Sequence, residues 1–314
     1  MTSQTLSPRL FFPFPAAPAG MPAWLPTLRA YSGFRVHEAK AGFEQQETLG
    51  RIGSLEIKLA SKAKHVRLAQ KLRYQVFYDE MSAAPHPAAA FWRRDVDQFD
   101  SICDHLVVFD REARGLDGLP RPKVVGTYRL LRQSVAERHG GFYTAGEYDV
   151  GGLFAQHREL KFLELGRSCV LAPYRDRRTV ELLWHGIWTY VRRHQIDVMI
   201  GCASFDGTNP DKLALPLSFL HHHAQAPEGW RVRALPKRYV EMNRLPKKAI
   251  DAKSALRALP PLIKGYLRLG AFVGQGAVVD RKFGTTDVFV ALPVSAINQR
   301  YIEHFGPGAE RHAA

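Results

Sequence analysis

The segment from residue 162 to residue 205 constrains the fold more than any other part of the chain. It opens with the strand-like run "FLELGRSCVLA", passes through "TVELLWHGIWTYVRR", and closes with "IDVMIGCASF". The middle run places its apolar residues on one helix face, suited to packing on a sheet: Val180, Leu183, Trp184, Ile187, Trp188 and Val191. The last run is almost continuously apolar, as in a central strand. A helix between two strands of one sheet requires a crossover, so the sequence predicts a parallel strand pair here.

The other patterns surround this unit. Alternating apolar residues predict a strand in 53–61, an antiparallel hairpin from 104–110 and 123–131, and two final strands in 276–292. Helical spacing predicts helices in 64–81, 216–224 and 259–270. This order predicts an α/β (α+β) fold in which helices flank a central mixed β-sheet.

Composition divides the chain into three parts. We expect the proline-rich residues 1–50 to be a flexible segment, residues 51–305 to form one domain, and residues 306–314 to be a tail. Prolines interrupt the apolar start of the chain, which is unlike the helix of a signal peptide. The sequence contains no run of eighteen apolar residues, so we expect no segment that spans a bilayer.

Positive charge is concentrated near the end of the predicted domain. The chain has 44 Lys and Arg against 30 Asp and Glu, a net charge of +14. Residues 231–268 hold eleven Lys or Arg and only two acids, and we interpret 231–262 as a basic insertion before the last hairpin. Such a stretch attracts nucleic acid, anionic lipid or an acidic protein. Because it lacks a recognition-helix pattern and regular aromatic interleaving, nucleic acid is the less favoured partner.

Four short blocks resemble the acyl-homoserine-lactone synthases, which have the GNAT N-acyltransferase fold. They read "RYQVF", "RDVDQFD", "VVGTYRLL" and "ELGRSCV". The positions that match the pattern are Arg73, Phe77, Asp97, Asp100, Arg129, Glu164 and Arg167. The resemblance implies a GNAT-type fold with a site built around these residues.

Longer blocks are more similar to a sister family, the L-ornithine Nα-acyltransferases. They are "LGRSCVLAPYRDRRTVELLWHGI", "IGCASFDGTNP", "LSFLHHH", "LPPLIKGYLRLGA" and "VVDRKFGTTDVFV", and the resemblance covers roughly residues 52–305. It implies transfer of a 3-hydroxyacyl chain from acyl carrier protein to the α-amino group of L-ornithine. The product would be lyso-ornithine lipid, formed in the first step of ornithine lipid biosynthesis. The resemblance implies no cofactor beyond the phosphopantetheine thioester of the carrier protein, which is a co-substrate.

The resemblance also suggests roles for the acceptor side, each with an alternative. Glu164 is the candidate base for the amine, because the free amine is mostly protonated at neutral pH; alternatively it pairs with an arginine as scaffold. Arg129 and Arg167 suit a carboxylate clamp, or form salt bridges with Asp97 and Asp100. As another possibility, Asp97 and Asp100 face the side-chain ammonium of ornithine. Arg73 is expected to order the loop that carries these two aspartates. Ser204 either contacts a substrate or caps a turn.

The donor side is expected where the strand at 162–172 runs into the next helix. Backbone amides near Cys169, Val170 and Leu171 are candidate pantetheine contacts and oxyanion donors. Arg175, Arg177 and Arg178 are candidates to meet the pantetheine phosphate and the acidic carrier protein. The segment "PYRDRRTVE" lacks the glycines with which coenzyme A users of this fold wrap a pyrophosphate, so we favour a carrier-protein donor.

Thiol and imidazole groups are the remaining reactive side chains. The three cysteines, Cys103, Cys169 and Cys202, form no CxxC pair, which argues against a disulfide framework or zinc site and favours a reducing cytoplasm. Cys169 is disfavoured as a nucleophile because no histidine accompanies it in the pattern. Histidines 221–223 point about 100° apart on a helix and do not readily share one ion. We therefore assign no metal site.

Other functions stay open at this point. An acyl-homoserine-lactone synthase would need an adenosylmethionine pocket, and the C-terminal third does not resemble those enzymes. Acylation of another amino acid would keep the same fold and chemistry, whereas nucleic-acid binding is the non-enzymatic alternative. We expect acyl carrier protein, L-ornithine and an anionic membrane surface as partners, no nucleic acid, and a cytoplasmic protein held peripherally on the inner face of the membrane.

Overall fold

The computed structural model describes residues 48–81, 83–115 and 117–298. Within them one eleven-stranded sheet runs in the order β1-β2-β3-β4-β6-β7-β11-β10-β8-β5, with β9 beside β10. The strands are β1 (Thr48–Ile52), β2 (Leu55–Leu59), β3 (Asp104–Asp110), β4 (Lys123–Arg132), β5 (Tyr148–Asp149), β6 (Phe162–Val170), β7 (Val198–Asp206), β8 (Arg233–Ala234), β9 (Tyr239–Val240), β10 (Phe272–Asp280) and β11 (Thr285–Pro293).

Helices of very different lengths connect these strands. The α-helices are α2 (Ala63–Tyr74), α3 (Pro87–Trp92), α4 (Gln133–Ala136), α5 (Gly151–Gln156), α6 (Arg177–Arg193), α7 (Ala214–His223), α8 (Ala252–Ala258) and α9 (Pro261–Arg268). The other helical turns are the π-helical η1 (Gln75–Glu80) and the 3₁₀ turns η2 (Gln98–Ser101), η3 (Glu137–His139), η4 (Tyr143–Gly146), η5 (Ala172–Tyr174), η6 (Lys247–Ala249) and η7 (Val294–Ala296).

The predicted crossover is confirmed, since β6 and β7 are parallel and α6 joins them. The β3–β4 and β10–β11 hairpins are antiparallel, as their alternating patterns predict. One boundary and the role of one segment differ from the sequence-based prediction. Strand β1 begins at Thr48, three residues inside the predicted segment 1–50. The segment 231–262 adds to the sheet, because its strands β8 and β9 both pair with β10. The predicted tail 306–314 lies outside the described residues.

Helices α2 and α6 cover opposite faces of the sheet. Gly186 of α6 lies close to the sheet, because an added Cβ would clash with a methyl of Ile57 on β2 and would be 3.4 Å from a methyl of Leu106 on β3. On α2, the ring of His65 meets the ring of Phe109 with centroids 5.3 Å apart. Because side chains alternate along a strand, Leu106 and Phe109 point to opposite faces. Each face of β3 is therefore covered by its own helix.

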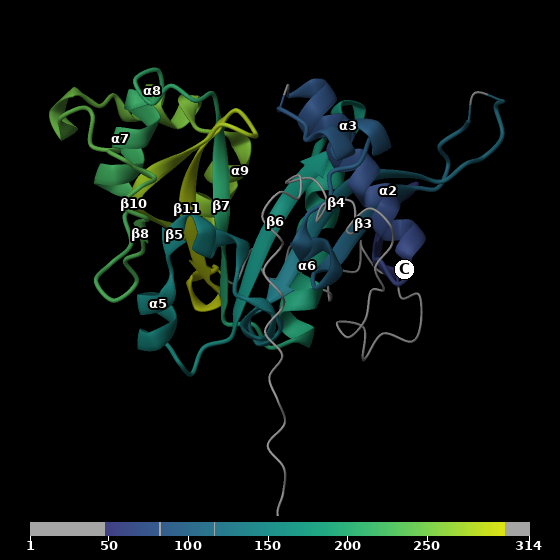
Figure 1. Cartoon of the computed structure of the whole chain (residues 1–314), viewed down its shortest axis with the longest axis horizontal. Coiled ribbons are helices and arrows are strands. Elements are labelled where there is room, and N and C mark those ends of the chain that lie inside the picture. Colours follow the sequence, from purple (N-terminus) through teal and green to yellow (C-terminus); the bar gives the residue numbers. More distant parts are fainter. Residues whose placement is uncertain (1–47, 82, 116, 299–314) are drawn as a thin grey trace, which may run out of the picture.

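The sheet opens between its two central strands. Strands β6 and β7 pair only at Phe162↔Val198, Leu163↔Met199 and Glu164↔Ile200, although β6 continues to Val170 and β7 to Asp206. On its other side β7 stays paired with β11 along its whole length. Figure 1 shows the result, two halves that diverge from a common base. Both strands keep unpaired edges beyond Glu164, and these edges are open to a ligand.

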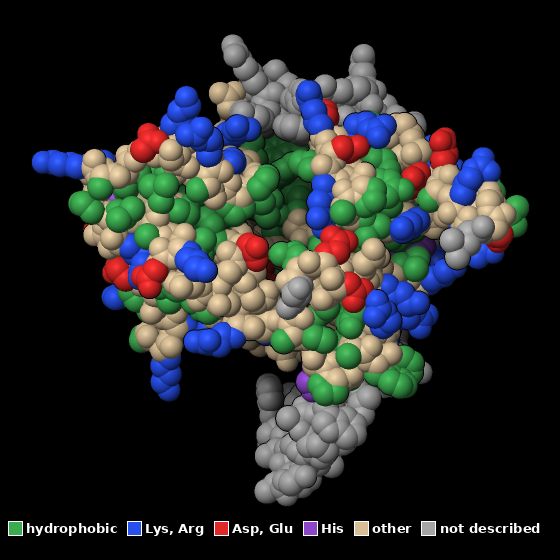
Figure 2. All heavy atoms as spheres, turned by 90° about the horizontal axis from the view of Figure 1, so that it is seen from above, with side chains coloured by type: hydrophobic (Ala, Val, Ile, Leu, Met, Phe, Trp, Pro, Cys, Tyr) green, Lys and Arg blue, Asp and Glu red, His purple; other side chains and the backbone are tan. Residues whose placement is uncertain are grey.

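An irregularity in β6 accompanies this divergence. Thr127 lies opposite Cys169, whereas Arg129 lies opposite Gly166, so β6 holds one extra residue in its pairing with β4. Arg167, within this bulge, has a φ of 50°, a left-handed conformation uncommon for a residue with a side chain. Bulges bend a strand and redirect side chains, and they are frequent next to active sites. Seen from above, a hollow lined by hydrophobic side chains lies between the two halves (Figure 2).

Candidate active site

A buried cluster of three arginines and three aspartates lies on one side of the opening. Arg73 of α2, with no exposed side-chain surface, donates to Asp100 from both terminal nitrogens at 2.8 and 2.7 Å, and its Nε lies 2.9 Å from Asp95. Arg129 of β4 donates to Asp97 at 2.6 Å and to Asp100 at 3.3 Å. Asp97 and Asp100 also form a capping box at the start of η2. The loop 94–103 is thus tied to α2 and β4 by charge.

The charges of this Arg–Asp cluster compensate one another. Burial by itself raises the pKa of Asp100, but Arg73 and Arg129 outweigh it and hold that pKa well below its ordinary value. The pKa of Asp97 is likewise lowered, because Arg129 and Arg167 outweigh burial. The structure therefore gives Arg129, Asp97 and Asp100 the salt-bridged arrangement that was one of the two readings of the sequence. Neither aspartate is left as a free anion.

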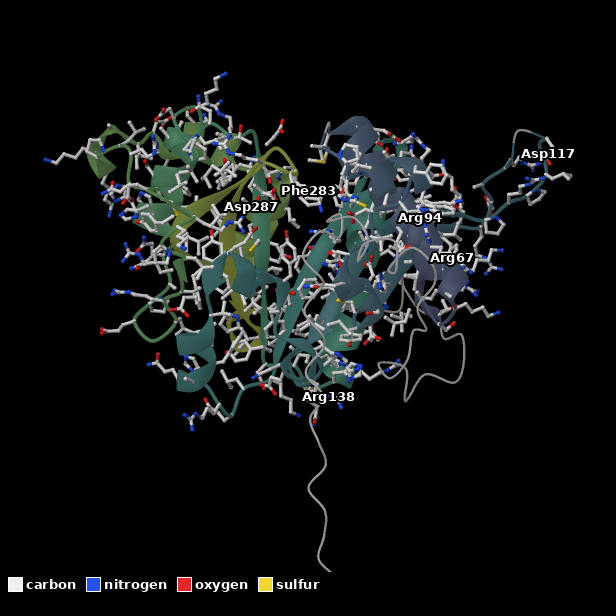
Figure 3. The ribbon with its side chains drawn as sticks, in the orientation of Figure 1. Arg67, Arg94, Asp117, Arg138, Phe283 and Asp287 are labelled. Atoms are coloured by element: carbon white, nitrogen blue, oxygen red, sulfur yellow. The ribbon has the colours of Figure 1, made fainter. Side chains whose placement is uncertain are left out.

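Arg167 completes the cluster and also reaches the opening. Its Nη2 donates to Asp97 at 3.2 Å and its Nε lies 3.4 Å from Asp95. The guanidinium lies over the rings of Tyr143 and Phe283, 4.9 and 4.6 Å from their centroids. Stacking of this kind holds a guanidinium without occupying all of its donors. Figure 3 places Phe283 in the β10–β11 hairpin, beside the gap between the halves.

Glu164 lies at the last paired position of β6, where the strands part. Its side chain is buried, and its two carboxylate oxygens accept the backbone N–H groups of Tyr143 at 3.0 Å and Thr144 at 2.7 Å. Burial raises the pKa of this carboxyl, although the hydrogen bonds from Thr144 and Tyr143 oppose the rise. The arginine partners considered from the sequence are replaced by backbone amides of η4. Glu164 thereby ties η4 to β6 at the point where the strands part.

A cavity of about 40 Å³ occupies the opening itself. Its walls come from β6, β7, α9 and one residue each of β4 and β11: Tyr128, Leu165, Gly166, Arg167, Ser168, Met199, Ile200, Gly201, Cys202, Ala203, Leu262, Tyr266 and Val290. Tyr128 and Tyr266 share a hydrogen bond of 2.9 Å across it. The sequence predicts Cys169, Val170 and Leu171 as the pantetheine contacts on β6. The β6 residues that line this cavity are instead the four that precede them, 165–168. Moreover, the Leu171 N–H is donated to the Val125 carbonyl at 2.9 Å and is not an oxyanion donor in this arrangement.

The three arginines expected to meet the donor lie at the start of α6. Each of these side chains forms an ion pair within the chain: Arg175 with Glu80, Arg177 with Glu181 and Arg178 with Asp176. The three are nevertheless 48, 81 and 65% exposed, so a partner surface can still reach them. At the helix N-terminus the carboxylate of Asp176 accepts the Thr179 N–H at 2.9 Å. An acidic side chain therefore already occupies the position at which an anion binds to a helix N-terminus.

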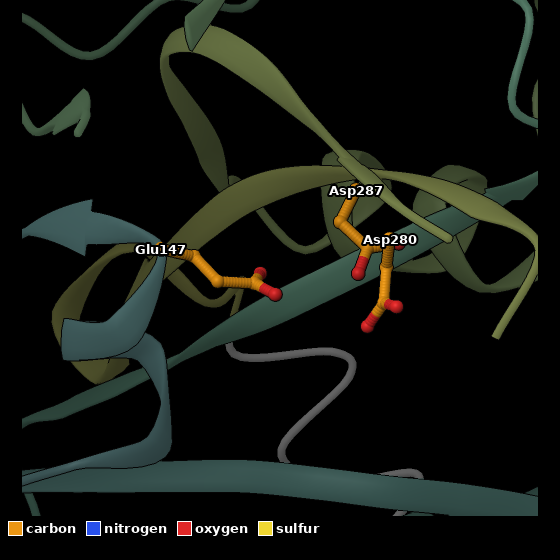
Figure 4. Close-up of side chains that lie close together, drawn as sticks. All are labelled: Glu147, Asp280 and Asp287. Atoms are coloured by element: carbon orange, nitrogen blue, oxygen red, sulfur yellow. The ribbon is translucent and has the colours of Figure 1, made fainter. Parts of the chain in front are cut away.

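The structure brings together a second acidic group that sequence reasoning missed. Glu147, Asp280 and Asp287 are all buried, and one carboxylate oxygen from each lies within 4.8 Å of the others (Figure 4). Burial, then the nearby Asp287, raises the pKa of Glu147 to about 7. The available signal was an acid inside an apolar strand, at Asp287 in "TTDVFV". Ser204 lies directly opposite Asp287 on β7, and its hydroxyl hydrogen-bonds to that carboxylate.

The thiol and the histidine tract take structural positions. Cys169 is buried, which raises the pKa of its thiol to about 12 and disfavours the thiolate form. His221 contacts the Gln225 amide at 2.8 Å, whereas His222 contacts the Leu245 carbonyl at 3.1 Å. These two imidazoles thus face different partners.

Comparison with known proteins defines the class. Residues 72–185 match the family model "Acetyltransferase (GNAT) domain". Among solved structures, the chain is similar to FeeM, an N-acyl amino acid synthase from uncultured soil microbes (TM-score 0.41, 11% identity, 77% of this chain and 91% of that chain). It is also similar to the AHL synthase LasI (TM-score 0.40, 12% identity, 80% of this chain and 93% of that chain). The chain is an acyltransferase with the GNAT fold.

Curated relatives narrow the class to one family. The chain is 54% identical to the L-ornithine N(alpha)-acyltransferase of Brucella abortus (strain 2308), over 84% of this chain and 92% of the relative. It is 52% identical to the protein of the same name from Rhizobium meliloti (strain 1021), over 85% of this chain and 90% of that relative. The chain belongs to the L-ornithine N(alpha)-acyltransferase family.

Proposed function

We propose that the chain transfers a 3-hydroxyacyl group from acyl carrier protein to the α-amino group of L-ornithine, which gives lyso-ornithine lipid. The observation that supports L-ornithine as the acceptor is that relatives 43–54% identical to the chain are named for this acylation. In the reaction the amine attacks the thioester carbonyl, the C–N bond forms and the C–S bond breaks. The amine loses a proton to a base, and the pantetheine sulfur leaves as thiolate and takes up a proton.

The opening between β6 and β7 is the proposed place of this reaction. The unpaired strand edges present backbone groups to the pantetheine arm, and the cavity wall is mostly apolar, as an acyl chain requires. Arg167 is the proposed clamp for the ornithine α-carboxylate, because it lines the cavity. Arg129 and Arg73, which are paired with Asp97 and Asp100, then have a structural role and stabilise the cluster to which Arg167 belongs. A fixed clamp lowers the barrier by orienting the amine towards the thioester.

Glu164 is the proposed base. Each of its oxygens accepts one backbone N–H, and a carboxylate oxygen has a second lone pair with which to accept a proton. Its raised pKa lies closer to neutral pH, where a general base is most effective. Glu164→Gln should lower kcat by 10²-fold or more, with partial recovery at high pH, where the amine loses its proton unaided. Wild-type kcat at pH 7 in this variant would exclude the role.

The direct test of the reaction uses purified protein, 3-hydroxyacyl-acyl carrier protein and L-ornithine. We expect an amide-linked product that mass spectrometry identifies as N(alpha)-acyl-ornithine. Acyl-coenzyme A with the same acyl chain tests the donor, and glutamine and glycine test the acceptor. Faster acylation of glutamine or glycine than of ornithine would overturn the proposed acceptor, and equal kcat/KM for both donors would overturn the proposed carrier-protein preference.

The exposed arginines at the start of α6 are the proposed contact with the acidic carrier protein. Changing Arg175, Arg177 and Arg178 to alanine should raise the KM for acyl carrier protein and have little effect on kcat. High salt should act in the same way, since exposed charges are screened over ~8–10 Å. The matched control replaces three exposed arginines around the β3–β4 turn: Arg111, Arg114 and Arg121. An unchanged KM in the first variant would contradict this contact.

We further propose that the protein binds the cytoplasmic membrane face peripherally. Within the described residues, no helix has the length and apolarity to cross a bilayer. Lysines 247, 248 and 253 of the η6–α8 segment are exposed, and Leu256 and Leu262 expose 45% and 36% of their surface beside them. Helix α3, at the same end of the molecule in Figure 1, exposes Phe91 to 79% and Trp92 to 48%. Basic and apolar groups together favour an anionic bilayer.

Vesicle flotation tests this membrane proposal. Binding should require anionic lipid and fall with salt, since each Lys near the surface contributes about 1 kcal/mol. A variant with Lys237, Lys247, Lys248 and Lys253 changed to glutamine should float poorly yet acylate ornithine in detergent. Arg238 stays unchanged, because it lies 3.4 Å from Glu147 within the fold. Equal binding of wild type to neutral and anionic vesicles would contradict the electrostatic part.

A further inference from the structure

The carboxylates of Glu147, Asp280 and Asp287 form an acidic cluster that is incompletely partnered. Glu147 is 2%, Asp287 6% and Asp280 8% exposed, yet Glu147 Oε2 and Asp287 Oδ1, both buried atoms, have no hydrogen-bond partner among the described residues. Buried polar atoms are normally hydrogen-bonded, and an exception calls for a missing ligand, ion or water. Figure 4 shows the three side chains converging from the end of η4 and from the β10–β11 hairpin.

Within the part of the chain that the structure describes, neighbouring basic side chains balance the charge of the acidic cluster only in part. Among the described residues, Arg238 forms an ion pair with Glu147, with its Nη2 3.4 Å away, and Arg167 has only a minor electrostatic effect on Asp287. By contrast, the Arg–Asp cluster contains three arginines for three aspartates. Burying a carboxylate without a partner costs several kcal/mol. A site that keeps this imbalance is suited to a cation that arrives with the substrate.

Asp287 of the acidic cluster lies on the same face of the sheet as Glu164, which marks the point where β6 and β7 part. Glu164 lies opposite Ile200, and Cys202 and Ser204 follow Ile200 at alternate positions of β7, so all four residues point to one face. Asp287 lies opposite Ser204 on the same face. Cys202 lines the cavity, and Ser204 is exposed. The unpaired edge of β7 thus connects the cavity, through Cys202 and Ser204, with Asp287.

We propose that Glu147, Asp280 and Asp287 form a subsite for the side-chain ammonium of a diamino acid acceptor and so select it over neutral amino acids. This inference rests on the proposed function and extends it. An alkylammonium carries three N–H donors, one for each carboxylate. A divalent cation fits less well, because the Arg238 guanidinium at Glu147 would repel it and because Asp280 Oδ1 already accepts the N–H groups of Lys282 and Phe283 at 2.8 and 3.1 Å. Arg167, across the opening, would hold the carboxylate of the same molecule.

The test compares L-ornithine with L-norvaline, which has the same carbon skeleton without the terminal amine. Wild type should show a kcat/KM for ornithine at least 10²-fold above that for norvaline, since a charged hydrogen-bonding site rejects an analogue that leaves it unpaired. Asp287→Asn should lower kcat/KM for ornithine by roughly 10–100-fold, the equivalent of one charge-assisted hydrogen bond, and should not lower it for norvaline. Glu147→Gln is the second variant, and the exposed Glu228→Gln is the control with an equal change of charge.

The possible outcomes distinguish failure of the subsite from failure of the proposed function. If wild type acylates ornithine and norvaline equally, the subsite is overturned while the acylation of ornithine stands. If the protein acylates neither but acylates another neutral amino acid, both proposals are overturned. An equal loss for both substrates in Glu147→Gln and Asp287→Asn would indicate a base or a structural role and overturn the subsite. Stoichiometric divalent metal in purified wild type, lost in Asp287→Asn, would assign the acidic cluster to a metal and overturn the ammonium assignment.

Discussion

Replacing Glu147 with glutamine should stabilise the protein at neutral and alkaline pH and leave it nearly unchanged in acid. The side chain is 2% exposed, and burial together with the nearby Asp287 carboxylate raises its pKa from 4.5 to about 7. Between these two values the folded protein keeps a proton that the unfolded chain releases. The stability that this proton provides is complete below pH 4.5 and is lost as the pH rises through 7.

The size of the effect follows from the two pKa values. One pKa unit corresponds to about 1.4 kcal/mol, so a shift from 4.5 to about 7 corresponds to about 3 kcal/mol between acid and alkaline conditions. Roughly 2.5 kcal/mol of this falls between pH 5 and pH 8. Glutamine has nearly the same shape and does not titrate. It also removes the negative charge near Asp287, which acts in the same direction.

Urea unfolding at pH 5 and pH 8 measures this difference. We expect the unfolding free energies of wild type and Glu147→Gln to be similar at pH 5, and that of the variant to be higher by two to three kcal/mol at pH 8. Glu228→Gln, an exposed substitution of the same chemistry, should track wild type at both pH values. A difference between Glu147→Gln and wild type that stays constant from pH 5 to pH 8 would refute the reasoning, because titration of Glu147 requires the difference to grow over this range.

Three further perturbations address the Arg–Asp cluster and the opening. Asp100→Asn leaves two buried arginines short of a counter-charge and should lower the unfolding free energy by roughly 3–5 kcal/mol in urea titrations; a loss below ~1 kcal/mol would contradict the buried pairing. Gly201→Ala would place a Cβ 2.5 Å from the Leu165 carbonyl oxygen and should lower both the thermal midpoint and kcat; a variant equal to wild type in both would contradict this close approach. Arg167→Lys keeps the charge but loses the planar fork, and should raise the KM for ornithine about tenfold with little change in kcat; an unchanged KM would exclude the carboxylate clamp.

The strands and helices that build the sheet were predictable because their signals are local. The stripe on α6 repeats with the period of a helix, and β7 is a short, nearly continuous apolar run, so the β6–α6–β7 crossover follows from the sequence alone. Strands β5, β8 and β9 have two residues each, too few for a period to be visible. Their existence depends on pairing with distant strands, which no local pattern encodes.

The charged residues of the site also divide into those that could be predicted from the sequence and those that could not. Asp97 and Asp100 stand near one another in a loop, and the matching arginines were visible through the resemblance to a family. Asp280 and Asp287 lie near each other across the β10–β11 hairpin, but Glu147 comes from a distant part of the chain and reaches them because η4, which precedes it, is held by Glu164. Long-range pairing decides which carboxylates become neighbours, and sequence spacing carries no record of it.

The Arg–Asp cluster and the acidic cluster differ in charge balance, and this difference indicates different roles for them. The aspartates of the Arg–Asp cluster were one candidate for receiving the ornithine ammonium, but each of them is already paired with at least one buried arginine. An ammonium placed there would have to displace a guanidinium, at the expense of leaving that guanidinium buried without a partner. The acidic cluster of Glu147, Asp280 and Asp287 has the opposite property, since a bound cation would relieve repulsion already present in the fold. A diamino acid therefore gains more by placing its carboxylate at Arg167 and its ammonium at the acidic cluster than by the reverse orientation, and this preference would point its α-amine consistently towards the opening between β6 and β7.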